Sequence, residues 1–561
     1  MEYLVFIAAV LAFAAFVIAQ GIWSDKKNQK LFLIKLKKLR GNPPDKEYKP
    51  ERYVEIPAYF EAHPESGQLD DITWNDLGMD DIFQRMDYSL SSTGEEYLYY
   101  LLRSPGRTEA ELAHFEGIIE YYRTHEEERI RLQCLMAKMG STGKNSLYRY
   151  LEYLTRLGQR SNGKEILCDL LFLPCIGILF VNLSVGILAI ALLMLYNIMS
   201  YFKVKKEIDP YLVSLAYIMR LADTAGQLQT YPGEAWQEER ERLREYRGRL
   251  SRFRHGPGWA MNMGAFMGTG GNPLELLMDY VRMLLHVDII AFNRMLKEVL
   301  GHLEDIDGLA GVLGYLESAV CVGLFRDSLM KGWCVPEFGG KTLKVEECYH
   351  PLLKDPVKNS IMAGRGVLLT GSNASGKSTF LKTVALNALM AQTVHTVTAD
   401  SYQAPICRIY SSMSLRDDLE SGESYYIVEI KSIKRILSAV REENMPVLCF
   451  VDEVLRGTNT VERIAASTQI LKSMAAGNCI CFAATHDIEL TGLLQGLYDN
   501  YHFEEEIEDG DVFFSYKLHS GRAASQNAIR LLGIMGYDES IVERAMRQAE
   551  LFKEQGVWKP T

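Results

Sequence analysis

The chain has 561 residues, of which 48% are hydrophobic and 24% charged, and its formal net charge is −11 at pH 7. This length predicts several folded units rather than one simple domain. The acidic balance argues against a chain-wide basic surface for nucleic acid, although a local basic face is compatible with it. The ten cysteines include no CxxC pair, which argues against a zinc or disulfide framework and predicts buried free thiols in a reducing compartment.

The N-terminal residues predict a membrane anchor. Tyr3 to Ala19 is an uncharged apolar run, and Gln20–Trp23 extends it to roughly the length of a membrane span. Glu2 is the only charged side chain before the run, whereas a cleaved signal peptide has a positive N-terminal region. Basic residues follow the run instead, which places the rest of the chain in the cytoplasm by the positive-inside rule: Lys26, Lys27, Lys30, Lys35, Lys37, Lys38 and Arg40. We expect an uncleaved transmembrane anchor over residues 1–24, with a cleaved signal or a buried helix as the alternatives.

A second apolar block runs from Leu170 to Phe202, interrupted by Pro174, Asn182 and Ser184. It is too long for one comfortable membrane pass and slightly short for two. A tight turn near Asn182–Ser184 would return the chain to its starting side, where further lysines follow. We therefore expect a transmembrane hairpin over residues 166–206, and a multi-pass protein of the cell membrane with about three transmembrane helices. A pair of core helices in a soluble domain is the alternative, and the sequence leaves open whether the block makes one pass or two.

The rest of the chain divides into a helical region and an α/β region. Apolar residues between 70 and 160 recur at helical spacing, and 207–254 mixes charges of both signs as a long exposed or coiled-coil helix does. From Gly332 on, short β-like runs alternate with helices, which predicts a parallel-rich sheet flanked by helices. We expect a multidomain fold with these parts: a transmembrane anchor (1–24), a basic, polar linker (25–69), a first helical part (70–165), the transmembrane hairpin (166–206), a second helical part (207–335) and an α/β domain ending in C-terminal helices (336–561).

The stretch LLTGSNASGKSTFLK, residues 368–382, has the strongest chemical signal. Gly371–Ser378 fits GxxxxGK[ST] and lies between an apolar strand and a helix-like run. The glycines let backbone N–H groups close around phosphate oxygens, and the helix N-terminus adds the positive end of its dipole. The pattern predicts a site for ATP and Mg²⁺, with Lys377 at the β- and γ-phosphates and the Ser378 hydroxyl on the metal. The predicted nucleotide contacts in this loop are Gly371, Ser372, Asn373, Ala374, Ser375, Gly376, Lys377, Ser378 and Thr379.

Acidic residues further along the chain predict hydrolysis. The apolar strand VLCFVDE ends in Asp452, placed to hold Mg²⁺ through water, and in Glu453, which can polarise the attacking water. A third strand, FAATHD, is followed by His486, a polar group facing the γ-phosphate in such an architecture. A surface acidic pair and a structural histidine are the alternatives, but together with an upstream phosphate loop these residues indicate an ATPase.

This set of motifs resembles one family, the MutS family of DNA mismatch-repair ATPases. TGSNASGKSTFLKTVAL resembles its phosphate loop, with Asn373 in the family's asparagine position, and VDEVLRGTNT resembles its Walker B segment. SSMSLRDDLESGESYYIVEIKSI is similar to its signature loop, while ATHD and GRAASQNAIRLLGIMGY are similar to its switch histidine and C-terminal motif. The resemblance covers roughly residues 345–550. Over roughly 70–335 it is weaker and purely helical, and would correspond to the family's core, lever and clamp region.

The resemblance implies a homodimer that closes on ATP. In such ATPases the signature loop of one subunit completes the nucleotide site of the other, here through Ser421, Gly422 and Ser424. ATP then clamps the two chains and hydrolysis releases them. The last helices, from Ala523 to about Lys553, would embrace the partner, so we expect dimerisation helices at the end of the ATPase domain. The family also implies a DNA partner, duplex or branched, and leaves repair or membrane partner proteins open.

Several features depart from the repair enzymes. No Phe-x-Glu triplet, the mismatch wedge, occurs before residue 371, and only about 70 residues precede the helical region, too few for connector and mismatch-binding domains. A membrane anchor is itself foreign to the repair enzymes. Val357 stands where those proteins often have an aromatic that stacks on adenine, and Leu455 replaces a glycine before Arg456. We therefore expect no direct reading of mismatches, and the adenine contact is not predicted.

The sequence as a whole predicts a MutS-related, membrane-anchored ATPase that acts as a dimeric clamp, with DNA as the expected target. Glu453 and His486 are the predicted catalytic residues, and Ser378 and Asp452 the predicted metal ligands. One alternative is a membrane ABC-type ATPase, which the absence of an LSGGQ motif and the small number of hydrophobic passes oppose. The other is an ATP-gated scaffold that organises membrane partners without binding DNA.

Overall fold

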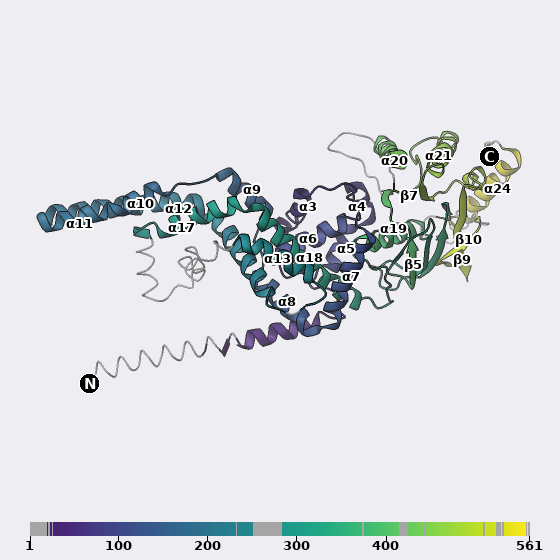
Figure 1. Ribbon diagram of the computed structural model, residues 1–561. Helices are drawn as coiled ribbons and strands as arrows, with labels where there is room; N and C mark the ends of the chain where they lie inside the picture. The colour runs from purple at the N-terminus through teal and green to yellow at the C-terminus, as the bar shows by residue number, and fades with distance from the viewer. Residues whose placement is uncertain are drawn as a thin grey trace. The chain divides into compact units, whose positions relative to one another are not determined.

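The computed structural model describes residues 20, 23–24, 26–231, 233–250, 283–372, 375–413, 425–442, 445–508, 511–522, 529, 532–533, 535–556 and 558. Two compact units alternate along the chain, and each is described by itself (Figure 1). Unit 1 comprises Met1–Pro64, Asp87–Tyr100 and Gly117–Phe325, and unit 2 comprises Glu65–Met86, Leu101–Glu116 and Arg326–Thr561. Most of the expected anchor over residues 1–24 lies outside the described residues.

Unit 1 is helical in the part that the structure describes. Its named helices are α2 (Pro50–Tyr53), α3 (Ala58–Ala62), most of α6 (Ser92–Arg103), the end of α7 (Glu109–Thr124), α8 (Glu126–Met139), α9 (Leu147–Leu157), α10 (Gly163–Leu170), α11 (Phe172–Val181), α12 (Leu183–Leu228), α13 (Gln237–Arg249), α17 (Val287–Gly301) and α18 (Leu303–Asp327). The core side chains of α18 recur every three or four residues, as the 3.6-residue helical period requires. Leu309, Leu313, Leu316 and Val320 are all at most 2% exposed. This apolar row buries α18 in the interior of the unit.

Residues 25–69, which the composition suggests are a linker, contain helices. A helix over 26–38 precedes α2 and α3. Leu36, Ile56 and Tyr59 are buried. The part of this segment that belongs to unit 1 therefore contributes to its core.

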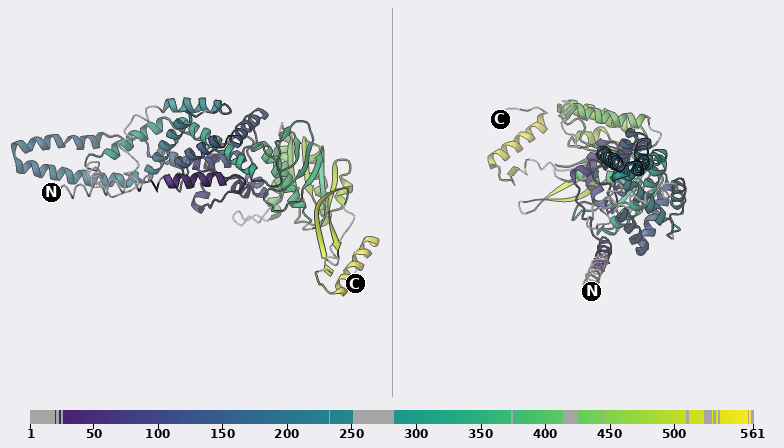
Figure 2. Two further views of the ribbon diagram at one scale, coloured as in Figure 1. Left: turned by 90° about the horizontal axis from the view of Figure 1, so that it is seen from below. Right: turned by 90° about the vertical axis from the view of Figure 1, so that its left-hand side faces the viewer.

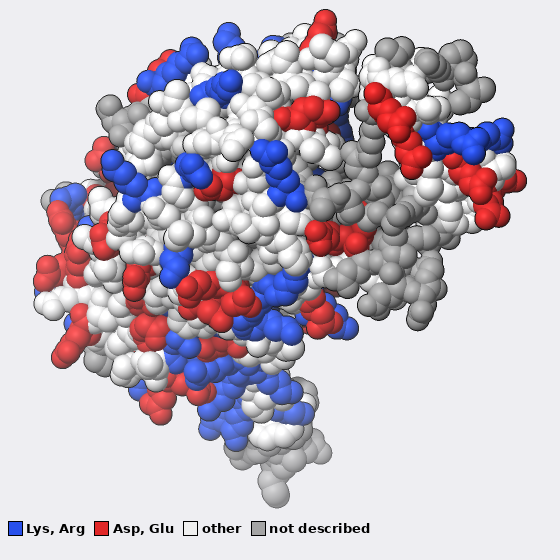
Figure 3. Space-filling view, turned by 90° about the vertical axis from the view of Figure 1, so that its right-hand side faces the viewer, with Lys and Arg blue, Asp and Glu red and all other residues white. Residues whose placement is uncertain are grey.

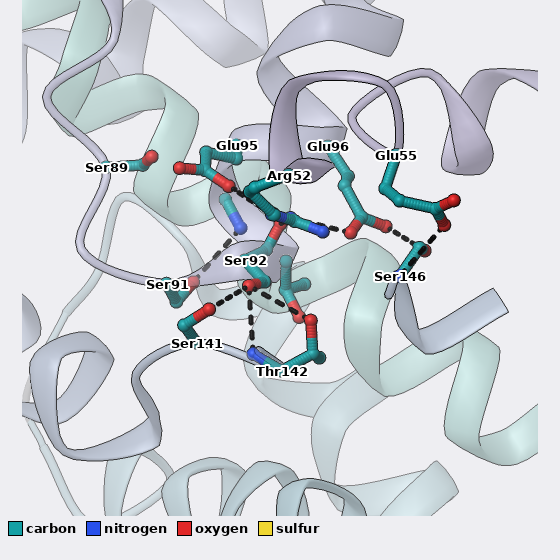
Figure 4. A network of polar contacts seen from close by, with 12 residues as sticks. Arg52, Glu55, Ser89, Ser91, Ser92, Glu95, Glu96, Ser141, Thr142 and Ser146 are labelled. Atoms are coloured by element: carbon teal, nitrogen blue, oxygen red, sulfur yellow. Dashed lines mark hydrogen bonds and ion pairs between the residues drawn. The ribbon is translucent and has the colours of Figure 1, made fainter. Parts of the chain in front are cut away.

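A buried polar network joins α2, α6 and the start of α9 (Figure 4). Arg52 donates to Glu95 Oε2 at 2.9 Å and to Glu96 Oε1 at 2.7 Å, and Ser146 Oγ donates to the other oxygen of Glu96 at 2.7 Å. Burial raises the pKa of Glu96 to about 7, although Arg52 and Ser146 act to lower it. Removing one partner of such a buried pair typically costs about 3–5 kcal/mol, so the network fixes how these three segments pack.

The second apolar block of the sequence forms a helical hairpin. α11 ends at Val181, and α12 begins at Leu183. Asn182 makes the turn, and its side chain caps α12 by accepting the N–H of Val185 at 3.2 Å. The turn thus lies where the sequence predicts it. α11 and the first part of α12 overlap in Figure 1 and lie side by side in the left-hand view of Figure 2.

Among the described residues, two helices are long and apolar enough to cross a membrane, α12 and α18. Of the apolar 18-residue stretch of α18, 83% is buried, so α18 is a core helix. The corresponding stretch of α12 is only 11% buried, and α11 has no buried residue. The exposure of the hairpin disagrees with the alternative in which the second apolar block is a core helix pair.

Unit 2 contains two β-sheets. The smaller sheet has the order β1-β5-β2-β3 and the larger has the order β10-β9-β4-β8-β7-β6. Within the larger sheet only β10 runs antiparallel to its neighbour, so the sheet is mostly parallel, as the strand–helix alternation predicts. The strands are β1 (Glu337–Phe338), β2 (Leu343–Cys348), β3 (Asn359–Ala363), β4 (Gly366–Thr370), β5 (Ser401–Ala404), β6 (Arg408–Ser412), β7 (Val447–Asp452), β8 (Cys479–Ala484), β9 (Tyr498–Glu508) and β10 (Asp511–Ser520).

Helices cover the larger sheet, and its central strands are buried on both faces. All five residues of β4 are buried, which is typical of a parallel strand between helical layers. Phe450 of β7 and Phe482 of β8 stack at 5.2 Å in the core. The named helices of unit 2 are α4 (Asp71–Leu77), α5 (Met79–Met86), the first part of α7, α19 (Lys377–Thr393), α20 (Tyr425–Glu442), α21 (Thr460–Ala475), α22 (Glu489–Leu493) and α24 (Glu539–Gln555).

Residues 65–86 join unit 2 through α4, although the sequence assigns 65–69 to the linker and 70–86 to the first helical part. Asp76 on α4 accepts hydrogen bonds from Ser411 Oγ at 2.6 Å and from the N–H of Met413 at 2.9 Å. Both partners lie at the end of β6, so α4 packs on the strand that edges the larger sheet.

Candidate functional site

A cavity of about 830 Å³ opens at the carboxyl ends of β4 and β7. Its walls include the first turn of α19, the acidic end of β7 and the loop after β8. Ligands of open α/β sheets bind at the carboxyl ends of the strands, and this volume suits a small-molecule ligand.

The glycine-rich loop between β4 and α19 forms the floor of the cavity. Gly371 has φ +147°, and a Cβ there would lie 2.9 Å from the carbonyl oxygen of Phe503. Gly376, at φ +103°, is the N-cap of α19 and provides no side-chain hydrogen bond. The loop therefore needs glycine at both positions, and the first N–H groups of α19 have no side-chain cap at this position.

Lys377 is the first residue of α19, and its side chain contacts the loop. Its Nζ donates to the carbonyl oxygens of Gly371 at 2.8 Å and Ser372 at 2.7 Å. Burial lowers the pKa of Lys377, although Asp452 and Glu453 act to raise it. An ammonium group that has lost part of its hydration and contacts neutral carbonyl oxygens would interact more strongly with an anion.

The hydroxyl of Ser378 and the carboxylate of Asp452 meet in the cavity. Ser378 Oγ donates to Asp452 Oδ2 at 2.5 Å. Ser378 stands in the first turn of α19, and Asp452 ends β7, so residues 74 positions apart in the chain converge at one point. Hard oxygen donors of this kind are the protein ligands that Mg²⁺ prefers.

Glu453 lies beside this pair between two basic groups. Its Oε1 is 3.0 Å from His486 Nε2, and its Oε2 is 2.6 Å from Arg456 Nε. The hydrogen bond from His486 and the charge of Arg456 lower the pKa of Glu453, although burial acts to raise it. Glu453 also has φ +62°, a strained value for a residue other than glycine. Its side chain is therefore an ionised carboxylate held at a fixed place.

The loop after β8 holds His486 by a second ion pair. Arg463 on α21 donates to both carboxylate oxygens of Asp487, at 2.6 and 2.8 Å. The N–H of Asp487 in turn donates to Thr485 Oγ1 at 3.0 Å. These contacts on both sides fix the backbone that carries the histidine.

A buried carboxylate supports the turn that follows Glu453. Glu429 of α20, 2% exposed, accepts the N–H groups of Leu455 at 2.5 Å and Arg456 at 3.2 Å. Leu455 has φ +59°, so the turn is strained at this position also. Burial raises the pKa of Glu429.

Two aromatic rings that the sequence patterns did not identify also line the cavity, those of Tyr516 and His350. Tyr516 of β10, 46% exposed, approaches the glycine-rich loop: a Cβ on Gly376 would lie 3.1 Å from its ring. His350 and Val357 also line the cavity. Burial, with a contribution from Lys382, lowers the pKa of His350 to about 4, so this imidazole is neutral at pH 7.

The structure brings together those members of the predicted site that it describes. Lys377, Ser378, Asp452, Glu453 and His486 all line the one cavity. So do Ser372, Gly376 and Thr379, whereas Gly371 and Ser375 complete the loop beneath. The remaining predicted contacts lie outside the described residues: Asn373, Ala374, Ser421, Gly422 and Ser424.

Sequence patterns missed three contributors to the site. Glu429 lies within the quoted signature segment, but its role depends on backbone groups 26 and 27 positions away. Tyr516 follows the loop by 140 positions and carries no local signal. Asp487 is adjacent to His486, and its pairing with Arg463 is visible only in the fold.

The fold and the site define a mostly parallel α/β domain with a glycine-rich loop before a helix and an acidic pair on a neighbouring strand. Residues 367–553 match the family model for MutS domain V. Over 234 residues, 41% of this chain and 28% of the relative, the chain is 32% identical to the DNA mismatch repair protein MutS of Thermus thermophilus. It is 31% identical over 289 residues to the DNA mismatch repair protein MutS of Fervidobacterium nodosum, covering 48% of this chain and 34% of the relative.

The chain is also 29% identical over 285 residues to the DNA mismatch repair protein MutS 2 of Haloarcula marismortui, covering 45% of this chain and 30% of the relative. Residues 367–553 of the chain are thus similar to domain V of the MutS family. The chain spans about a third of the length of these curated relatives.

Proposed function

We propose that the chain is a membrane-anchored, MutS-related ATPase that uses Mg²⁺ and works as a dimeric clamp. The observation that carries this proposal is the contact of Ser378 with Asp452 beside Glu453, directly above the glycine-rich loop. A metal ligand pair and an ionised base at the end of a parallel sheet are the parts that phosphoryl transfer to water needs.

The residues present fit ATP and Mg²⁺. The N-terminus of α19, with no side-chain cap at Gly376, is a site for phosphate oxygens, and the ammonium of Lys377 can exchange its carbonyl partners for them. Within the described residues, no group of three or more His, Cys, Asp or Glu side chains is placed to hold a metal. This agrees with Mg²⁺, which keeps several waters and uses few protein ligands. When bound, Mg²⁺ neutralises charge that develops on the phosphates.

Glu453 is the proposed general base, with His486 as its partner. An ionised carboxylate can accept a proton from water, and the low pKa of Glu453 keeps it ionised at neutral pH. His486 holds one carboxylate oxygen, which orients the other. Arg456 contacts that second oxygen at 2.6 Å, and the oxygen keeps a further lone pair that can accept a proton from water.

The adenine base is proposed to lie against Tyr516. This ring is half exposed, reaches over the loop and lies in the same cavity as Val357, which has no ring to stack on the base. Stacking on an aromatic face contributes about 1–3 kcal/mol per base.

Dimerisation is proposed from the signature loop. In the test, a chain that carries both Ser424→Ala and Lys377→Ala is paired with a wild-type chain. If Ser424 of one chain completes the partner's site, each of the two sites then contains one of the two substitutions. The purified heterodimer should then be inactive. If Ser424 acts within its own chain, one site stays whole and activity survives, which would refute the shared site.

Membrane anchoring is proposed from the apolar hairpin and from the N-terminal run of the sequence. The exposed lysines over residues 26–38 and the lysines after Phe202 support a cytoplasmic α/β domain by the positive-inside rule. Figure 3 shows Lys and Arg gathered on the projection at the bottom of the view, which this N-terminal helix forms. Extraction of membranes with alkaline carbonate tests the anchor, because an inserted protein stays in the pellet.

DNA is the proposed target, since the matched relatives are named DNA mismatch repair proteins. A second candidate, an ATP-gated scaffold without DNA, is favoured by the net charge of −11. In the described part of the face in Figure 3, Lys and Arg side chains away from the projection are mixed with Asp and Glu. The ATPase rate with homoduplex, mismatched and branched DNA separates the two: stimulation that falls with salt supports the DNA clamp, and an unchanged rate supports the scaffold.

A further inference from the structure

The hairpin of α11 and α12 presents an apolar surface with no described protein to cover it. Its large side chains are exposed on both arms and at the turn: Leu170 53%, Leu173 65%, Ile176 44%, Phe180 88%, Val181 89%, Leu183 66%, Ile187 57%, Leu188 60%, Leu192 59% and Leu195 55%. No charged residue occurs from Leu170 to Phe202. A helix that is hydrophobic all round is stable only when protein or lipid surrounds it. Because no described part of the chain does, the hydrocarbon of a bilayer is the occupant that the surface fits.

Polar contacts hold both arms of the hairpin near its base. Asp169, next to the first arm, is 3.0 Å from Nδ1 of His286, and that histidine is 1% exposed. On the second arm, Asn197 Nδ2 donates to the carbonyl oxygen of Leu284 at 3.1 Å, and Tyr201 contacts Asp288 at 3.1 Å. These contacts bind the base of the hairpin to the start of α17, so the base is part of the folded unit 1.

The arms above this base are short. From Leu170 to Val181 the first arm has 12 residues and rises about 18 Å, and from Leu183 to Tyr196 the second has 14 residues and rises about 21 Å. The hydrocarbon core of a bilayer is about 30 Å thick. With the paired Asp169 kept at the membrane surface, the turn at Asn182 stops roughly 10 Å short of the far side.

The turn is itself suited to hydrocarbon. Phe180, Val181 and Leu183 surround it and are its most exposed side chains, so a turn in water would expose all three. Part of its backbone is paired locally: the N–H of Asn182 donates to the carbonyl oxygen of Ile178, and the N–H of Gly186 donates to the carbonyl oxygen of Asn182. The Asn182 side chain accepts the N–H of Val185. Lipid requires such internal pairing of backbone groups.

We propose that the hairpin is a re-entrant anchor: it enters the bilayer from the cytoplasmic side and ends within the hydrocarbon core. This proposal rests on the proposed membrane association. It means that neither arm of the hairpin over residues 166–206 crosses the whole bilayer, in place of the two passes of a transmembrane hairpin. The base at Asp169 and Asn197 then lies at the membrane surface and sets the depth of insertion.

Cysteine labelling of the full chain tests the depth of the turn. Ser184→Cys, an isosteric change at the exposed turn, is compared with Ser161→Cys at the exposed base and with the parent chain, whose ten cysteines give the background. A membrane-impermeant maleimide is applied to sealed vesicles of both orientations. Ser161→Cys should gain label only in inside-out vesicles. Ser184→Cys should gain label in neither orientation and should gain it after detergent; Val185→Cys repeats the test if Ser184→Cys does not fold.

Two results would overturn the re-entrant anchor while membrane association stands. Label on Ser184→Cys in right-side-out vesicles would show that the turn crosses the bilayer. Label on it in inside-out vesicles would show that the turn lies in the cytoplasm. Release of the whole protein by alkaline carbonate is a different failure, because it removes the membrane association on which the proposal rests. Disulfide-linked pairs of Ser184→Cys chains in a membrane-free fraction would also overturn it, since a second copy would then cover the hairpin.

Discussion

The carboxylate of Glu429 accepts the backbone N–H of Leu455 at 2.5 Å, two residues beyond the proposed base Glu453. Leu455 has φ +59°, in the left-handed region that costs an ordinary residue roughly 1–2 kcal/mol. The same carboxylate oxygen accepts the N–H of Arg456, so one buried side chain of α20 supports the strained turn. Glu429 is thus a positioning residue: it acts on the base through the backbone of the turn.

Glu429→Ala should lower kcat for ATP at least ~10-fold and leave the affinity for ATP nearly unchanged. The reason is that hydrogen bonds to a charged group are lost, about 1.5–3 kcal/mol, at a turn that positions the base and not the phosphates. Glu429→Gln retains an acceptor oxygen and should recover most of the rate. Glu442→Ala, at the exposed end of the same helix, is the control. Steady-state kinetics and calorimetric ATP binding measure the split; wild-type kcat in Glu429→Ala would disprove the positioning role.

Lys377→Ala should act on binding. The variant removes the ammonium group that now contacts the Gly371 and Ser372 carbonyls and that we expect to transfer to the phosphates. Loss of a charge-assisted contact should raise the Kd for ATP at least ~10-fold. Lys434→Ala, exposed on α20, should leave the Kd unchanged. Titration calorimetry with ATP and Mg²⁺ decides, and an unaltered Kd in Lys377→Ala contradicts the assigned role.

Short sequence patterns predicted that the side chains of the site converge at one cavity, because each pattern encodes the end of one strand. The loop before Lys377, the carboxylates after Val451 and the histidine after β8 each follow a buried strand, and parallel strands bring their carboxyl ends to one edge. The turn at Asn182 was also predictable from a local pattern, because a polar residue interrupts a long apolar run. Local chemistry was sufficient in these cases.

Contacts between distant segments were not predictable. The hydrogen bond between Asp76 and Ser411 holds residues 65–86 in unit 2, and neither segment alone predicts this contact. The reach of Tyr516 toward Gly376 depends on an irregularity between Phe514 and Leu518 in the β9–β10 ladder. Both α12 and α18 are apolar enough to cross a membrane, but α12 is exposed and α18 is buried, and this difference is visible only in the fold.

Unit 2 should lose stability in acid through Glu116. Burial acts to raise the pKa of Glu116, but hydrogen bonds from Arg326 and His395 outweigh it and lower the pKa to about 2, from an ordinary value of 4.5. A carboxyl with a depressed pKa stabilises the fold above its unfolded pKa. This contribution, about 3 kcal/mol, should therefore be present above pH 4.5 and disappear as the pH falls toward 2.

Glu116→Gln should remove most of this pH dependence. Its free energy of unfolding should be lower than that of the wild type at pH 7, and the gap should narrow between pH 4.5 and pH 2. Glu109→Gln, exposed in the first turn of the same helix, should behave as the wild type. Urea denaturation of the full chain followed by fluorescence at several pH values measures this, and a gap independent of pH would count against the assignment.

The central claim is that Glu453 activates water at a site for ATP, and one comparison tests it most directly. Glu453→Gln keeps the shape of the side chain and removes the base, so ATP should bind with the wild-type Kd while turnover falls at least ~100-fold. Glu489→Gln, exposed at the start of α22, should turn over at the wild-type rate. Single-turnover hydrolysis of ATP by the purified full chain is the measurement. A wild-type rate in Glu453→Gln would contradict the account.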